Sequence, residues 1–371
     1  MNGSQQSNGS TPSFFSYKYL VISVSLSVLS MLIVVYLTYT PGIFEHLKPK
    51  RLPGLFIALA VSLLRVWFQA ARFRFMSDNE IGWFASIRIV LSWDFTSSVT
   101  PSTIGGAPMA TYAMTREGLS LGKSTALVLY SVLLDQLWFA MAIPILIITG
   151  FYYTVLPGTL GFIGESAMAV VYAAILSYAT LLTYAVFVNP AALKTVVKRV
   201  FRLPILNRMY DKVNRESDNL EQYARKLGSK PKSFIAKAFG LTLLTWLARI
   251  WLPTIVVLSL LPADVIYSLL RSLAMNLAFL AMPTPGGSGG VEGLFAIFQG
   301  PLIDKKGFIG LAVFLWRVIS YYITIGLGIM ATTWYINQKV VEHNFEKKKK
   351  AETYSGDSVN DADTRLENIP D

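Results

Sequence analysis

Long apolar runs recur along most of the chain, separated by short polar segments. An α-helix needs about 20 apolar residues to cross the hydrocarbon core of a bilayer, and six runs are long enough to do so. They are Leu20–Thr40, Leu52–Phe75, Ser124–Gly150, Ala167–Val188, Ile235–Leu261 and Phe308–Asn337. The first run has no charge and no small-residue cleavage site, so we expect a permanent span rather than a signal peptide. The pattern predicts an all-α polytopic membrane protein.

Two further apolar stretches, Ile81–Glu117 and Ala263–Ile303, are interrupted near their middles by proline and glycine. The interrupting residues are Pro101, Gly105 and Gly106 in the first stretch, and Pro285, Gly286, Gly287, Gly289 and Gly290 in the second. Lipid cannot satisfy the backbone groups that such breaks free, so they persist at membrane depth only inside protein or beside water. We therefore expect two re-entrant hairpins, each made of two half-helices that meet at a broken tip.

An internal repeat at an offset of 184 residues links the two halves of the chain. It pairs Leu63, Arg65 and Trp67 with Leu247, Arg249 and Trp251, Phe95 with Phe279, Pro101 with Pro285, and Gly105–Gly106 with Gly289–Gly290. Each unit then consists of a span, a broken hairpin and a span, over residues 52–150 and 235–337. The single span at 167–188 between them would invert the second unit. Inverted repeats with discontinuous helices are typical of secondary transporters.

Basic residues predict which side each loop faces. The segment 189–232 carries eleven Lys or Arg against four Asp or Glu, and four lysines follow the last span at 347–350. Placing both in the cytoplasm also puts Arg72, Arg74, Arg116 and Lys123 there, whereas Lys48, Lys50 and Arg51 fall outside, against the rule. We expect one membrane domain at 19–337 in the cytoplasmic membrane of a prokaryotic cell, with disordered cytoplasmic tails at 1–18 and 338–371.

Composition agrees with this class and narrows the chemistry. Of 371 residues, 53% are hydrophobic and only 15% are charged, against about a quarter charged in a soluble domain. The chain has no cysteine, which excludes disulfides and thiolate ligands. The net charge of +11 lies mostly in loops between spans, which favours anionic lipid over nucleic acid as the partner. No nucleotide, metal or cofactor motif is present. Residues 286–290 fit G-x-S-x-G, but the strand setting and nearby histidine that motif requires are missing.

Charged residues inside the apolar stretches are costly and are candidates for function. The basic set is Arg65, Arg249, Arg88, Arg271 and Arg317, and the acidic set is Asp94, Asp135 and Glu292. One interpretation is structural ion pairing, for example of Asp135 with an arginine. The other is a shared cavity for an anion, because the arginines outnumber the acids and guanidinium binds phosphate in a bidentate fork. Helices that begin after each Gly-Gly pair would add inward-facing N–H groups.

The central basic segment contains a further amphipathic pattern. Apolar residues at 193, 196, 197, 200 and 201 alternate with Lys194, Lys198, Arg199 and Arg202. This spacing predicts a helix that lies on the cytoplasmic leaflet or caps the bundle.

The segment Pro285-Gly-Gly-Ser-Gly-Gly-Val-Glu292 resembles the Pro-Gly-Gly-x-Gly-x-x-Glu signature of the lysylphosphatidylglycerol synthase transmembrane region, the flippase domain of multiple peptide resistance factors. Pro101, Gly105–Gly106, Arg116, Gly118 and Asp135 are similar to that family's first block. Ser131 and Val132 stand where the family often has an acidic-basic pair. The resemblance implies movement of a lipid or its headgroup between leaflets.

The sequence thus predicts a lipid translocase that holds a headgroup phosphate with Arg65, Arg249, Arg88, Arg271 and Arg317, together with Asp135 and Glu292. We expect membrane phospholipid as partner and no catalysis. The alternatives are a transferase acting on a polyprenyl-phosphate-linked sugar, with Asp94, Asp135 or Glu292 as base, and a membrane partner of a lipid synthase. The lipid, the coupling ion and a homo-oligomeric state are left open.

Overall fold

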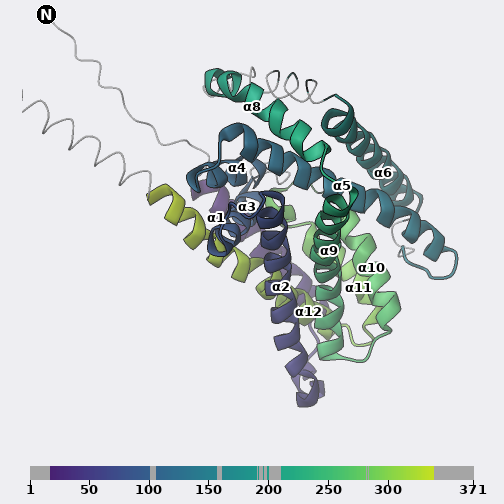
Figure 1. Ribbon diagram of the computed structural model, residues 1–371. Helices are drawn as coiled ribbons and strands as arrows, with labels where there is room; N and C mark the ends of the chain where they lie inside the picture. The colour runs from purple at the N-terminus through teal and green to yellow at the C-terminus, as the bar shows by residue number, and fades with distance from the viewer. Residues whose placement is uncertain are drawn as a thin grey trace, which may run out of the picture.

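The structure is a computed structural model that describes residues 17–100, 106–156, 161–189, 210–280 and 284–337, and a few single positions between these ranges. The first tip residues Pro101 and Gly105, the amphipathic pattern at 193–202 and most of both tails lie outside the described residues. Within the described ranges the chain is helical and contains no strand (Figure 1).

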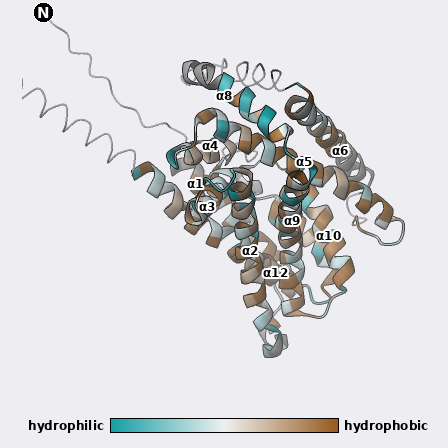
Figure 2. Ribbon diagram, viewed as in Figure 1, coloured by the Kyte–Doolittle hydropathy of each residue, from teal (hydrophilic) through white to brown (hydrophobic). Residues whose placement is uncertain are grey.

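Six helices are long and apolar enough to cross a membrane, and each coincides with a predicted span. Hydrophobic residues, coloured brown, recur along α2, α5, α6 and α9 in the hydropathy-coloured ribbon (Figure 2). They are α1 (Tyr17–Thr38), α2 (Pro53–Met76), α5 (Leu121–Gly150), α6 (Gly161–Thr183), α9 (Lys232–Leu260) and a last helix from Gly307 to Asn337 that begins as α12 (Gly307–Arg317). The prediction of an all-α polytopic membrane protein is confirmed.

The two interrupted stretches form helix–break–helix hairpins. In the first, α3 (Trp83–Val99) precedes the break and α4 (Gly106–Arg116) follows it; in the second, α10 (Val265–Phe279) and α11 (Val291–Gln299) flank a short turn at Pro285–Gly287. The two limbs of each hairpin pack against each other. All four helices are shorter than the roughly 20 residues of a full crossing, which fits the predicted half-helices.

The equivalent first helices of the two units, α2 and α9, pack against each other in opposite directions. Gly54 near the start of α2 lies against Ser259 near the end of α9, and the rings of Phe75 and Phe234 at the other end stack with centroids 4.7 Å apart. Antiparallel packing of equivalent helices is the relation that an inverted repeat requires. Two large apolar cores each draw residues from both units, and a small cluster of Phe95, Val99, Tyr321 and Ile325 joins α3 to the last helix.

A helix that the sequence pattern did not reveal, α8 (Tyr210–Gly228), lies across one end of the bundle (Figure 1). Its buried residues Leu220, Ala224 and Leu227 pack on the start of α5. At Gly122 the backbone of α8 is so close that a side chain would meet the Leu220 nitrogen at 2.6 Å. This part of the basic segment therefore caps the bundle.

Candidate functional site

The middle of the α2–α9 pair carries charged side chains from both units. Arg65, halfway along α2, is buried and pairs with Asp94 of α3 through Nη2 and Oδ2 at 2.6 Å. Its Nη1 donates to Gln69 one turn further along the helix, at 3.3 Å. The α2–α3 contact of the first unit therefore contains a closed ion pair.

A second ion pair lies two turns along α2, on the same face. Arg72 is almost fully buried and binds both oxygens of Asp135 on α5, at 2.7 and 3.2 Å. Its Nη1 also donates to Thr242 of α9, and the Trp246 indole donates to Asp135 Oδ1 at 2.9 Å. Because four groups converge here, this pair joins α2, α5 and α9. Asp135 therefore pairs with an arginine, and the partner is Arg72.

Arg249 is the repeat equivalent of Arg65, and the antiparallel register places the two at the same level of the α2–α9 pair. It lies near Arg65, Asp94 and Asp135, but among the described residues no carboxylate is within ion-pair distance. Its guanidinium carbon lies 4.8 Å from the centre of the Trp246 ring, and the residue is only half-buried. Arg249 is thus a membrane-depth cation with an aromatic neighbour and no acid of its own.

The repeat explains why Arg249 lacks a carboxylate. In the 184-residue register, the position that corresponds to Asp94 is Ala278 on α10. The second unit has kept the arginine and has alanine in place of the acid. The three arginines and two aspartates of this central cluster (Arg65, Arg72, Arg249, Asp94 and Asp135) leave one positive charge unbalanced.

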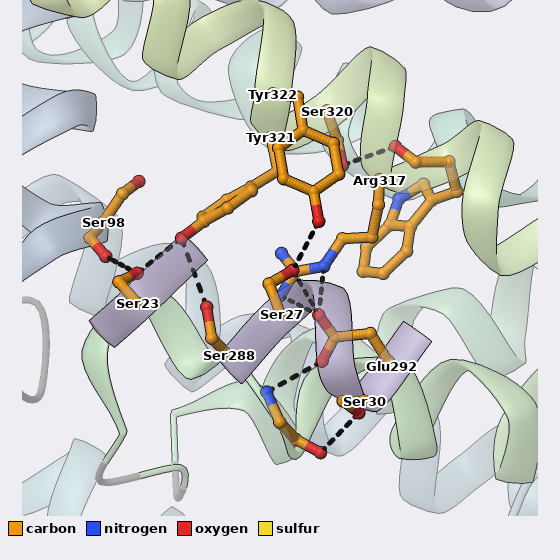
Figure 3. A network of polar contacts seen from close by, with 12 residues as sticks. Ser23, Ser27, Ser30, Ser98, Ser288, Glu292, Arg317, Ser320, Tyr321 and Tyr322 are labelled. Atoms are coloured by element: carbon orange, nitrogen blue, oxygen red, sulfur yellow. Dashed lines mark hydrogen bonds and ion pairs between the residues drawn. The ribbon is translucent and has the colours of Figure 1, made fainter. Parts of the chain in front are cut away.

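A second polar network surrounds Glu292 at the tip of the second hairpin (Figure 3). Glu292 is fully buried and faces Arg317 of α12, whose Nε donates to its Oε1 at 2.8 Å. The other oxygen accepts from the Gly289 backbone at 2.9 Å, and the Ser27 hydroxyl of α1 donates to Oε1 at 2.7 Å. Both carboxylate oxygens are therefore occupied. A π-helical turn, Val318–Tyr322, follows Arg317 directly, and such turns are frequent at functional sites.

The glycines of the second tip are required by its geometry. Gly286, Gly287 and Gly289 have φ of 58°, 70° and 92°, a backbone region that favours glycine. A side chain at Gly286 would also lie 2.7 Å from the Ser98 carbonyl oxygen at the end of α3. The second tip thus touches the end of the helix that leads into the first break, in line with the prediction that the two tips meet.

Two of the predicted site residues lie elsewhere. Arg88 pairs with Glu117 at 2.8 Å and lies 3.8 Å from the centre of the Trp334 ring, so it ties the first hairpin to the end of the last helix. Arg271 donates to the carbonyl oxygens of Phe298 and Thr154, both at 3.1 Å.

The seven predicted headgroup residues therefore occupy four places rather than one. Arg65, Arg249 and Asp135 share the central cluster, Arg317 and Glu292 form the tip network, and Arg88 and Arg271 stand apart. Of the predicted tip residues, Gly106 begins α4, where a side chain would collide with Ser97 and Trp93. Pro285 opens the turn of the second tip, and Gly290 follows the three positive-φ glycines.

Sequence reasoning missed several members of these clusters. Arg72 was counted only as a loop charge, although its spacing of seven residues from Arg65 puts both on one helical face. The serines of α1 and the pair Tyr321–Tyr322 carried no charge to mark them. No group of three or more metal-binding side chains occurs in the searched, described part of the chain.

Six membrane-length helices, two broken hairpins and buried ion pairs at mid-helix define a polytopic α-helical membrane protein. A family model for the lysylphosphatidylglycerol synthase TM region matches residues 20–328, and the chain belongs to this family. A UPF0104 membrane protein of Archaeoglobus fulgidus is 26% identical over 302 residues, which cover 78% of this chain and 87% of that relative.

Proposed function

We propose that the protein is a lipid translocase of the cytoplasmic membrane, which moves a phospholipid or lipid-linked headgroup between leaflets without changing it chemically. Arg249 carries the proposal. A cation at membrane depth is costly unless it has a partner. With no carboxylate beside it among the described residues, a passing phosphate is the chemically natural counter-ion, since guanidinium binds phosphate oxygens in a fork.

The neighbours of Arg249 suit a transient rather than a permanent ligand. Asp94 and Asp135 already hold Arg65 and Arg72, so the local charge is +1 before a headgroup arrives. A phosphate diester would neutralise this charge, and the nearby carboxylates would keep its binding from becoming too tight. The acyl chains would remain in lipid beside the half-buried Arg249. Both termini and the basic segment at 189–232 would face the cytoplasm, beside anionic lipid.

Reconstitution of Arg249 variants tests this function. Vesicles would carry fluorescent phosphatidylglycerol, and dithionite would report how fast the label leaves the inner leaflet. Arg249→Gln removes the charge and should slow transport roughly ten- to hundredfold, the worth of a charged hydrogen bond. Arg249→Lys keeps the charge without the fork and should fall between. Thermal stability in detergent should hardly change, because no carboxylate loses its partner.

Two controls make this experiment decisive. Arg74 lies in the last turn of α2, away from the centre of the α2–α9 pair, and donates to the Ile81 carbonyl. Arg74→Gln should therefore leave transport unchanged. Mass spectrometry of the recovered lipid separates movement from chemistry: an altered headgroup would favour a transferase. Full transport by a stable Arg249→Gln protein would refute the proposal.

A further inference from the structure

Helix α1 belongs to neither repeat, yet it hydrogen-bonds to both hairpins. Ser23, Ser27 and Ser30 line one face of it. Ser23 is fully buried; its hydroxyl donates to the Ser98 carbonyl at the end of α3 at 2.7 Å and lies 2.6 Å from the Tyr321 hydroxyl (Figure 3). A single helix outside the repeat thus reaches the edge of the first break.

The other two serines of this face reach the second tip. Ser27 donates to Glu292, and it accepts from the Tyr322 hydroxyl at 3.2 Å. Ser30 donates to the Gly289 carbonyl at 2.9 Å. The serine face of α1 (Ser23, Ser27 and Ser30) therefore spans the place where the two hairpins meet.

The carboxyl end of α1 is held in a different way. At Gly310 of α12 a side chain would lie 2.8 Å from the Val35 α-carbon, so the two helix backbones are in close contact there. Gly307, at the start of α12, lies against the side chains of Thr40 and Ile43, which follow α1 in the chain. This end is anchored by close backbone packing at Gly310, whereas the half of α1 with the serine face combines hydroxyl hydrogen bonds with side-chain contacts of Leu20, Val24 and Leu26.

Release of the serine face would leave no buried charge without a partner. Glu292 would keep Arg317 and the Gly289 N–H, and the groups that lose a bond are neutral hydroxyls and carbonyls. Only 17% of the residues in the apolar window of α1 are buried, against 39% for α2 and 50% for α9. The helix is thus the least enclosed of these spans, and its polar contacts with the hairpins are made by neutral serine hydroxyls.

We propose that α1 is a latch, which pivots on its Gly310 anchor and swings its serine face away from the second tip and the end of α3 to separate the two hairpins. In the closed position, α1 covers the place where the second tip meets the end of α3. The role of this opening in headgroup passage rests on the proposed function, but the opening itself can be measured without any transport.

The absence of cysteine makes thiol labelling a clean test. Ser288 is fully buried at the second tip, and Ser288→Cys places a reporter there. In lipid nanodiscs, a water-soluble maleimide should label it slowly. Hydrogen bonds between helices in membranes are worth little each, so Ser23→Ala, Ser27→Ala or Ser30→Ala should each speed labelling about threefold, and all three together about twentyfold. Ser25→Ala, at an exposed position of the same helix, should leave the rate unchanged.

Equal labelling rates in the triple variant and its parent, at unchanged melting temperature, would overturn the latch. So would an equal acceleration by Ser25→Ala. Should the triple variant fail to fold, Ser23→Ala alone decides, because Ser23 contacts no charged group. A protein that opens by this measure but moves no lipid would sustain the latch and refute the proposed transport.

Discussion

The two repeat units have the same order of helices but a different electrostatic design. Among the described residues, the first unit contains the buried or half-buried ion pairs Arg65–Asp94, Arg72–Asp135 and Arg88–Glu117, and also Lys123–Glu80, whose carboxylate is exposed. The second has one, Glu292–Arg317, and it lies at the broken tip. Glycine and proline at the breaks are shared, and so is the central arginine, Arg65 or Arg249.

This difference separates what the fold needs from what the site needs. Helix length, the breaks and the antiparallel α2–α9 contact recur in both units, so they belong to the architecture. The acidic residues differ between the units in both position and number, so the shared architecture does not require them. The first unit balances its central arginine internally, and the second leaves Arg249 for a partner from elsewhere. The two units share one frame of helices, and the difference in their charges leaves Arg249 as the candidate site.

The largest effect is expected at the buried Glu292–Arg317 pair of the second unit. Glu292→Ala leaves Arg317 buried without a carboxylate, and removing one partner of a buried pair costs about 3–5 kcal/mol. The free energy of unfolding in mixed micelles measures this loss. Glu117→Ala in the first unit is the matched comparison, since Arg88 and Glu117 are 29% and 17% exposed against 4% and 0% for Arg317 and Glu292. Its loss should be clearly smaller. Equal losses would show that burial does not distinguish the two pairs.

The sequence predicted the architecture well because lipid imposes strict rules. The lengths of the apolar runs predicted the six spans to within a few residues, and the proline–glycine breaks predicted both hairpins. The repeat alone identified Arg65 and Arg249 as equivalent positions. These features depend on local composition and on spacing along the chain.

Partner choice could not be predicted in the same way. Asp94 pairs with Arg65, Asp135 with Arg72 and Glu292 with Arg317, and each choice depends on which helices pack together. The hydrogen bonds of the α1 serines and the docking of α8 likewise depend on tertiary packing, because a serine in an apolar helix can also bond its own backbone. A buried arginine near a helix end, such as Arg72, also has the sequence signature of a loop charge.

A single substitution can give Arg249 of the second unit a carboxylate partner like that of Arg65 in the first. Ala278→Asp places a carboxylate at the repeat equivalent of Asp94, where it should pair with Arg249. If Arg249 holds a headgroup phosphate, the new acid competes with it, and transport should fall about tenfold or more. Stability should be retained or slightly raised. Ala278→Asn is the matched control of similar size without charge and should transport better than Ala278→Asp. Equal transport by both would show that the asymmetry at this position has no functional role.

The smallest effect concerns a contact that only the first unit makes. Asp78, in the exposed turn after α2, binds Lys230 at 2.6 Å and lies 3.7 Å from Lys226, whereas the equivalent position in the second unit is Pro262. The hydrogen bond from Lys230 lowers the pKa of Asp78 below its ordinary value of 3.8.

A lowered pKa of Asp78 stabilises the folded state above pH 3.8, and this contribution is lost as the pH falls through the folded-state value. At pH 7, Asp78→Asn should therefore loosen α8 by under about 1 kcal/mol, as for an exposed pair, and hydrogen exchange of the α8 amides should show it. The difference from the parent protein should vanish at strongly acidic pH, and Lys226→Ala should have less effect than Lys230→Ala. A difference that does not change with pH would mean that the Asp78 charge does not hold α8 to the first unit.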